Sequence, residues 1–148
     1  VPDLERLNLI LGLETHGEYG TGKSLANVAK LVGSPRVGVN YDTANVVFYG
    51  GVLPEEEIKD CADRVVYVHL KDKVGIDKVW NFPAVGKGEL KLLDTVSYLD
   101  EFGYKGPLSI EIEFTEAYTM RAKAEGDLAF SNQAVKDSYE YLAQKGLV

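Results

Sequence analysis

Runs of apolar and β-branched residues alternate with segments of helical periodicity along the chain. The pattern predicts strands at about Leu7–Glu14, Arg36–Tyr41, Val65–Leu70 and Leu108–Glu113. It predicts helices at about Gly22–Val32, Pro54–Asp63 and Lys91–Phe102, and a last helix from a Ser131 cap to near Gly146. Strands that alternate with helices are typical of a parallel sheet covered by helices, so we predict an α/β fold.

The repeating strand-helix units fill residues 1–148, and we predict a single structural unit without a linker or a second domain. A closed barrel of eight such units takes roughly 250 residues. The predicted units therefore correspond to half of a (β/α)8 barrel. Half a barrel leaves two unpaired sheet edges and an apolar inner face. We expect the other half to be missing or supplied by another chain, or two copies to close against each other.

Composition narrows the classes of partner and compartment. The net charge is −7 and no basic stripe is visible, which argues against a nucleic-acid binder. No apolar run approaches the roughly 20 residues of a membrane-spanning helix, so we expect no membrane partner. Cys61 is the only cysteine, which fits a cytoplasmic protein, and we expect it to pack in the core.

Each predicted strand carries a potential metal ligand at or near its carboxyl end. Glu14, Asp42 and His69 belong to the first three strands, and Glu111 and Glu113 belong to the fourth. Because the carboxyl ends of parallel strands meet at one edge, these side chains could converge on one point. Alone, each has an ordinary explanation, as a helix cap or a core residue. Together they suit a hard divalent cation, Mn²⁺, Mg²⁺, Co²⁺ or Fe²⁺, better than a thiolate-seeking metal.

The alternation of side chains along a strand adds neighbours to these residues. His16 shares a face with Glu14 and could approach whatever Glu14 holds. Lys71 shares a face with His69 in the same way.

A competing motif follows the first strand. Gly17–Ser24 fits the phosphate-binding pattern G-x-x-x-x-G-K-[ST] and opens a predicted helix. However, three residues separate the apolar strand from the first glycine, and Asp42 comes too soon to be the Mg²⁺-binding aspartate of that fold. A P-loop nucleotide binder is therefore the weaker alternative.

Several segments resemble a known family. LETHGEYGTG, VGVNYDTAN, VVYVHLKD, the Gly86-Lys87-Gly88 turn and GYKGPLSIEIE are similar to the second half of the xylose isomerase-like TIM barrels. That family contains sugar and sugar-phosphate isomerases, ketose 3-epimerases, inositol-derivative dehydratases and the endonuclease IV branch. The resemblance covers nearly the whole chain and implies four βα units that form the C-terminal half of a (β/α)8 TIM barrel.

The resemblance also implies roles for individual residues. The metal ligands would be Glu14, Asp42, His69 and Glu111. Glu111 is preferred to Glu113 because Leu108-Ser109-Ile110-Glu111 matches the family's aliphatic-Ser-aliphatic-Glu run. The two glutamate ligands would also be the catalytic pair that exchanges a substrate proton.

Three further residues would bind substrate. His16 lies beside the first ligand, Asn45 stands where many relatives carry a histidine, and Lys71 would contact an oxyanion or a phosphate unless it is simply solvated. We thus predict a divalent-metal-dependent isomerase or epimerase that acts on a small sugar, polyol or sugar phosphate. An inositol-type dehydratase and a non-catalytic half-barrel fragment or subunit are the alternatives. The chain lacks the extra histidines of an endonuclease IV-like nuclease, which disfavours that branch.

Overall fold

The structure, a computed structural model, describes residues 1–115, 117–118, 120, 126 and 128–148. Its main sheet is parallel, with the order β1-β2-β3-β5. The strands are β1 (Leu11–Glu14), β2 (Val37–Asp42), β3 (Val65–Lys71) and β5 (Leu108–Glu111). This confirms the predicted α/β class and the partial barrel with its βα order.

Capping residues and glycines mark the ends of two longer helices. Helix α2 (Gly22–Val32) starts at Thr21, whose hydroxyl accepts the Ser24 N–H, and stops at Gly33 in the left-handed region. Helix α5 (Leu92–Phe102) also ends in a left-handed glycine, Gly103. Both helices occupy nearly the predicted residues.

Some predicted boundaries were wrong. The first strand begins four residues late because a short helix, α1 (Pro2–Arg6), precedes it and Asn8 adopts a left-handed φ of 53°. The helix predicted from Pro54 to Asp63 is broken into α4 (Pro54–Glu57) and the 3₁₀ turns η1 (Ile58–Asp60) and η2 (Ala62–Arg64), separated by the non-helical Cys61. Ser131 is not a cap but lies inside α7 (Ala129–Gln144).

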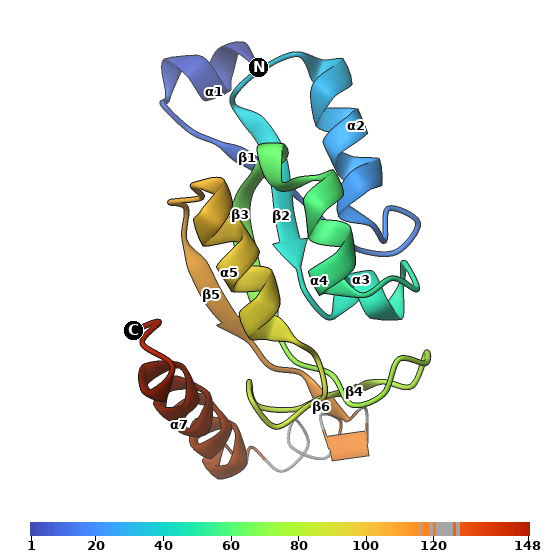
Figure 1. Cartoon of the computed structure of the whole chain (residues 1–148), viewed down its shortest axis with the longest axis vertical. Coiled ribbons are helices and arrows are strands. Elements are labelled where there is room, and N and C mark those ends of the chain that lie inside the picture. The colour runs from blue at the N-terminus through green and yellow to red at the C-terminus, as the bar shows by residue number, and fades with distance from the viewer. Residues whose placement is uncertain (116, 119, 121–125, 127) are drawn as a thin grey trace.

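Besides α1, three short elements of the described residues were not predicted. Helix α3 (Asn45–Phe48) follows β2, and β4 (Asn81–Phe82) pairs antiparallel with β6 (Phe114–Thr115). The β4–β6 ribbon joins the long loop after β3 to the segment after β5 (Figure 1). The last predicted strand therefore stops at Glu111, and the Glu113 N–H donates to Phe82 O instead.

The apolar core lies between one face of the sheet and the elements that cover it, with residues from α2, α3, α5, α7 and the turns η1 and η2 (Figure 1). From the sheet it takes Val39, Tyr41, Val68 and Leu70, which alternate with residues of the opposite face. Cys61 is buried in this core, as expected. Within the described part of the chain, no helix has the length and apolar character needed to cross a membrane.

Candidate metal centre

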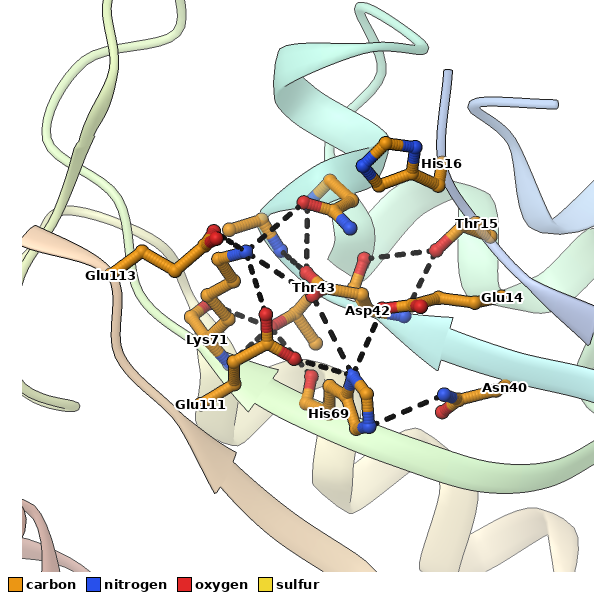
Figure 2. Close-up of polar contacts among 12 residues, drawn as sticks. Glu14, Thr15, His16, Asn40, Asp42, Thr43, His69, Lys71, Glu111 and Glu113 are labelled. Carbon is orange, nitrogen blue, oxygen red and sulfur yellow. Dashed lines mark hydrogen bonds and ion pairs between the residues drawn. The ribbon is translucent and has the colours of Figure 1, made fainter. Parts of the chain in front are cut away.

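The carboxyl ends of the main strands bring the predicted ligand residues together (Figure 2). Glu14 ends β1, Asp42 ends β2, His69 lies near the end of β3 and Glu111 ends β5. One donor atom from each of these residues lies within 4.8 Å of all the others. The cluster therefore has the dimensions of a cation site.

Nδ1 of His69 is the centre of this cluster. It lies 2.6 Å from Glu111 Oε2, 3.1 Å from Glu14 Oε1 and 3.8 Å from Asp42 Oδ2. Strands β1 and β5 are the outer strands of the sheet, yet both of their glutamates reach this one atom. Three carboxylates thus face a single imidazole nitrogen.

The two oxygens of Asp42 have different environments. Oδ1 accepts the N–H groups of Ala44 and Asn45 at 2.9 and 2.8 Å, which holds the first turn of α3 against the strand end. Oδ2 is fully buried and has no hydrogen-bond partner among the described residues. Burial raises the pKa of Asp42 to about 7, although Lys71 and the two backbone N–H groups act in the opposite direction.

His69 and Glu111 stabilise each other's charged forms. The hydrogen bond with Glu111 raises the pKa of His69 above its ordinary value, against the effect of burial. The same bond lowers the pKa of Glu111 to about 2, and Lys71 adds to this lowering. The pair therefore favours an imidazolium–carboxylate couple beside the other two carboxylates.

Lys71 is the second cation of the site. Its side chain is buried, and Nζ contacts Glu111 Oε1 at 2.9 Å, Asn45 Oδ1 at 3.3 Å and the carboxylate of Glu113. Burial alone would lower the pKa of Lys71, but Asp42, Glu113 and Glu111 together raise it. The ammonium also lies 4.6 Å from the centre of the Phe82 ring. Lys71 is thus a fixed positive charge and not a solvated surface lysine.

Two buried threonines fix the strand ends that carry the site. Thr15 Oγ1 accepts the Asp42 N–H at 3.0 Å, and Thr43 Oγ1 accepts the Lys71 N–H at the same distance. Thr43 also donates to Lys71 O at 2.7 Å. Each hydroxyl hydrogen-bonds the end of one strand to its neighbour, so the side chains of the cluster project from strand ends that are held together.

The structure separates the predicted substrate residues. Asn45 and Lys71 contact each other at the site. His16 lies apart from the ligand cluster: its Nε2 is 3.0 Å from the Tyr49 hydroxyl, and the two rings meet at a tilt with their centroids 4.4 Å apart. Glu113 is not part of the cluster and pairs with Lys71 instead.

Sequence reasoning missed two features of the site. Asn40 lies on the inner face of β2, two residues before Asp42, and its amide contacts His69. Strand alternation would have placed it there, had it been applied to β2. Phe82 contacts Lys71 from the loop after β3, and no local pattern indicates that contact.

The donor set fits a hard divalent cation. It offers carboxylate oxygens and one imidazole, the ligands suited to Mn²⁺, Mg²⁺, Co²⁺ or Zn²⁺. The buried Asp42 Oδ2 lacks a hydrogen-bond partner within the described residues, and a cation bound there would supply an electrostatic partner. The residues that could hold the ion are Glu14, Asp42, His69 and Glu111.

Comparison with known protein families identifies the family of this chain. The family described as the xylose isomerase-like TIM barrel matches residues 1–144. The chain belongs to the xylose isomerase-like TIM barrel family. Membership confirms the resemblance seen in the sequence. It also explains the strand-helix order without a nucleotide-binding P-loop at Gly17–Ser24. The start of α2 is also occupied, because the Lys23 N–H donates to Glu57 Oε1 at 2.6 Å.

Known members and solved structures resemble the chain over part of their length. A 72-residue stretch is 39% identical to the 3-oxo-isoapionate decarboxylase of Pectobacterium atrosepticum and covers 49% of this chain and 26% of that protein. The structure of an L-ribulose 3-epimerase superposes with a TM-score of 0.69 at 18% identity, covering 97% of this chain and 48% of its own. The structure of the IolI protein with a bound zinc atom superposes with a TM-score of 0.67 at 18% identity. That match covers 93% of this chain and 49% of the IolI chain.

The chain therefore spans about half of each of these two structures and 26% of the decarboxylase. The two structural likenesses show the fold of a xylose isomerase-like half-barrel.

Proposed function

We propose that the protein acts as a divalent-metal-dependent isomerase or epimerase on a small sugar, polyol or sugar phosphate, by proton transfer next to a carbonyl group. The observation that carries this proposal is the cluster of Glu14, Asp42, His69 and Glu111, in which the buried Asp42 Oδ2 has no hydrogen-bond partner among the described residues. The sugar epimerases among proteins of the same fold support the substrate class.

The side chains of the site support distinct tasks in such a reaction. A divalent cation held by the cluster would polarise adjacent carbonyl and hydroxyl oxygens of the substrate. Glu14 and Glu111 approach the cluster from opposite edges of the sheet, so one can remove a proton from carbon and the other can return it. Lys71 offers a fixed positive charge to a developing oxyanion, and Asn45 and His16 offer hydrogen bonds to hydroxyl groups.

A decarboxylase is the second candidate, favoured by the 39% identity with the 3-oxo-isoapionate decarboxylase over 72 residues. Loss of CO₂ from a 3-oxo acid leaves an enolate, the same kind of anion that proton removal beside a carbonyl generates. The positive groups that would stabilise one would stabilise the other. A dehydratase that expels a β-hydroxyl from that anion is a third use of the scaffold.

The cation site can be tested by calorimetric titration with Mn²⁺. We expect one tight site in the wild type that is lost in His69→Ala, because the imidazole is the centre of the cluster. His16→Ala is the matched control, since it removes the only other histidine and leaves the cluster intact. Equal binding by the wild type and His69→Ala would refute the site.

The reaction can be tested in D₂O with the Mn²⁺-loaded protein, a panel of ketoses and 3-oxo acids, and a quench with chelator. Proton transfer predicts deuterium at the carbon beside the carbonyl, whereas decarboxylation predicts release of CO₂. Glu14→Gln and Glu111→Gln should each lower the exchange rate at least about 100-fold. The exposed Glu18→Gln, in the loop after β1, should leave it unchanged.

The open sheet implies a partner for activity. We propose that the inner face and both edges are closed by a complementary half-barrel, either the remaining half or a second copy of the chain. The half-length coverage of relatives supports this. On its own the chain would then bind the cation but lack one wall of the substrate site, so the exchange test in D₂O is made on the chain assembled with that complementary half.

A further inference from the structure

His69 must present one particular nitrogen to a cation in the cluster. Its Nδ1 is the atom that faces the carboxylates of Glu14, Asp42 and Glu111. A neutral imidazole that offers its lone pair at Nδ1 carries its proton on Nε2. The group beside Nε2 therefore decides whether this tautomer is favoured.

That group is the side-chain amide of Asn40. Its Nδ2 lies 3.2 Å from His69 Nε2, and the contact is drawn in Figure 2. Asn40 Oδ1 is buried and has no hydrogen-bond partner among the described residues. Rotation of the amide by half a turn exchanges the two atoms and places Oδ1 beside Nε2. A hydrogen bond from Nε2–H would then satisfy a buried oxygen that otherwise has none.

The surroundings hold both side chains in place. Asn40 pairs in register with Glu14 on one side and Tyr67 on the other, and the Tyr67 ring meets the His69 ring edge-on at 5.6 Å. Gly12 leaves room for the amide, since a Cβ there would lie 3.2 Å from Asn40 Cβ. Among the described residues, the contact recorded for the amide is with the histidine ring, and its neighbours hold it in position to meet that ring.

We propose that Asn40 is a positioning residue for the cation site: its amide oxygen accepts the Nε2–H of His69 and leaves the Nδ1 lone pair for the cation. This inference rests on the proposed metal function. Hydrogen bonds of this kind to metal-binding histidines typically change metal affinity 10–100-fold when removed.

Two substitutions at this position separate acceptor from donor. Asn40→Asp keeps an acceptor and cannot donate when ionised, whereas Asn40→Leu keeps the approximate volume and can do neither. We expect Asn40→Leu to weaken Zn²⁺ binding about 10–100-fold, and Asn40→Asp to bind at least as tightly as the wild type. Circular dichroism of each variant checks that it is folded.

Asn40→Asp also adds a negative charge, which could by itself change the affinity for a cation. A spectroscopic measurement avoids this by observing the Nε2–H of His69 directly. The protein has two histidines, so ¹⁵N-histidine labelling gives two ring systems, which His16→Gln assigns. In the Zn²⁺-loaded wild type and Asn40→Asp we expect a slowly exchanging Nε2–H signal from His69, and its loss in Asn40→Leu. A merely structural role for Asn40 would not predict that signal.

The outcomes separate the two proposals. Wild-type Zn²⁺ affinity in folded Asn40→Leu, or the absence of the Nε2–H signal in Zn²⁺-loaded wild type, would overturn the role of Asn40 and leave the metal site standing. If Asn40→Leu does not fold, loss of the signal in Asn40→Asp overturns the role equally. No Zn²⁺ binding by the wild type would overturn both proposals.

Discussion

At the scale of single residues, the two carboxylate oxygens of Asp42 have opposite effects on stability. Its Oδ1 holds the start of α3, and this requires the carboxylate to be buried. Its Oδ2 then lies in the interior with Lys71 Nζ and His69 Nδ1 at 3.7 and 3.8 Å, beyond hydrogen-bond distance. Burial of an incompletely paired charge is costly, and a bound cation would offset that cost.

This cost predicts how stability depends on pH in protein freed of metal by a chelator. The pKa of Asp42 rises from 3.8 to about 7 on folding, so between these values the folded state keeps a proton that the unfolded state has released. The contribution of Asp42 to stability is therefore fully present below about pH 4 and lost as pH rises to about 7. Between pH 4 and pH 8 the wild type should therefore lose about 4 kcal/mol of stability relative to Asp42→Asn, which has no carboxylate to ionise.

Urea unfolding at pH 4, 6 and 8 measures this difference. His69 and Glu111, whose pKa values also shift, are present in both proteins, so the comparison isolates Asp42 to first order. Saturating Mn²⁺ should reverse the order, because only the wild type would gain stability from a tightly bound ion. A difference that does not vary with pH would contradict the assignment.

At the scale of elements, one aspartate organises the long loop after β3. Asp72 is buried, and its carboxylate accepts the N–H groups of Lys73, Gly86, Gly88 and Leu90 at 2.9 to 3.3 Å. Gly88 has to be a glycine here, because a Cβ would collide with the carboxylate. This anchor folds the loop back so that Phe82 covers the Lys71 ammonium.

Asp72→Ala should therefore loosen the loop as well as destabilise the protein. We expect a loss of about 3 kcal/mol in the free energy of unfolding, because several backbone N–H groups lose a charged acceptor. Trypsin should also cleave after Lys87 several times faster. Asp77→Ala is the matched control in the same loop, where the side chain is 66% exposed, and it should cost less than about 1 kcal/mol. Equal effects of the two substitutions would show that Asp72 is not the anchor.

The predictability of each element follows from the range of the interactions that form it. Strand and helix order could be predicted because apolar periodicity and caps such as Thr21 and Gly33 are local signals. The meeting of the strand ends could also be predicted, since parallel strands share one edge. The β4–β6 ribbon has only two residues in each strand, and the pairing of Phe82 with Phe114 depends on contacts 32 positions apart (114 minus 82). Periodicity in so short a segment carries no signal.

At the scale of the whole molecule, the two faces of the sheet differ. One face is covered by helices, whereas the other is open and forms a hollow of about 410 Å³ lined by Ile10, Gly12, Asn40, Val66, Tyr67, His69 and Pro107. Leu9, Ile10 and Leu11 are about half exposed at the β1 edge, at 51%, 57% and 46%. An apolar edge beside an open face is a surface for strand pairing.

Ile10→Lys tests whether this surface drives association of the chain with itself. The side chain is exposed in the isolated chain, so we expect the fold to tolerate lysine. A charge in the hollow would have to be buried on pairing, which should weaken self-association at least about 10-fold. Sedimentation velocity over a range of concentrations measures the association constant, and circular dichroism checks the fold.

Leu31→Lys supplies the control, because Leu31 is an 88% exposed leucine on α2, away from the open face. It should associate like the wild type if the open face is responsible. A wild type that stays monomeric at all concentrations would contradict closure by a second copy and favour a different chain as the complementary half. Association weakened equally by both substitutions would instead indicate non-specific apolar contact, because Ile10 and Leu31 lie on different surfaces of the half-barrel.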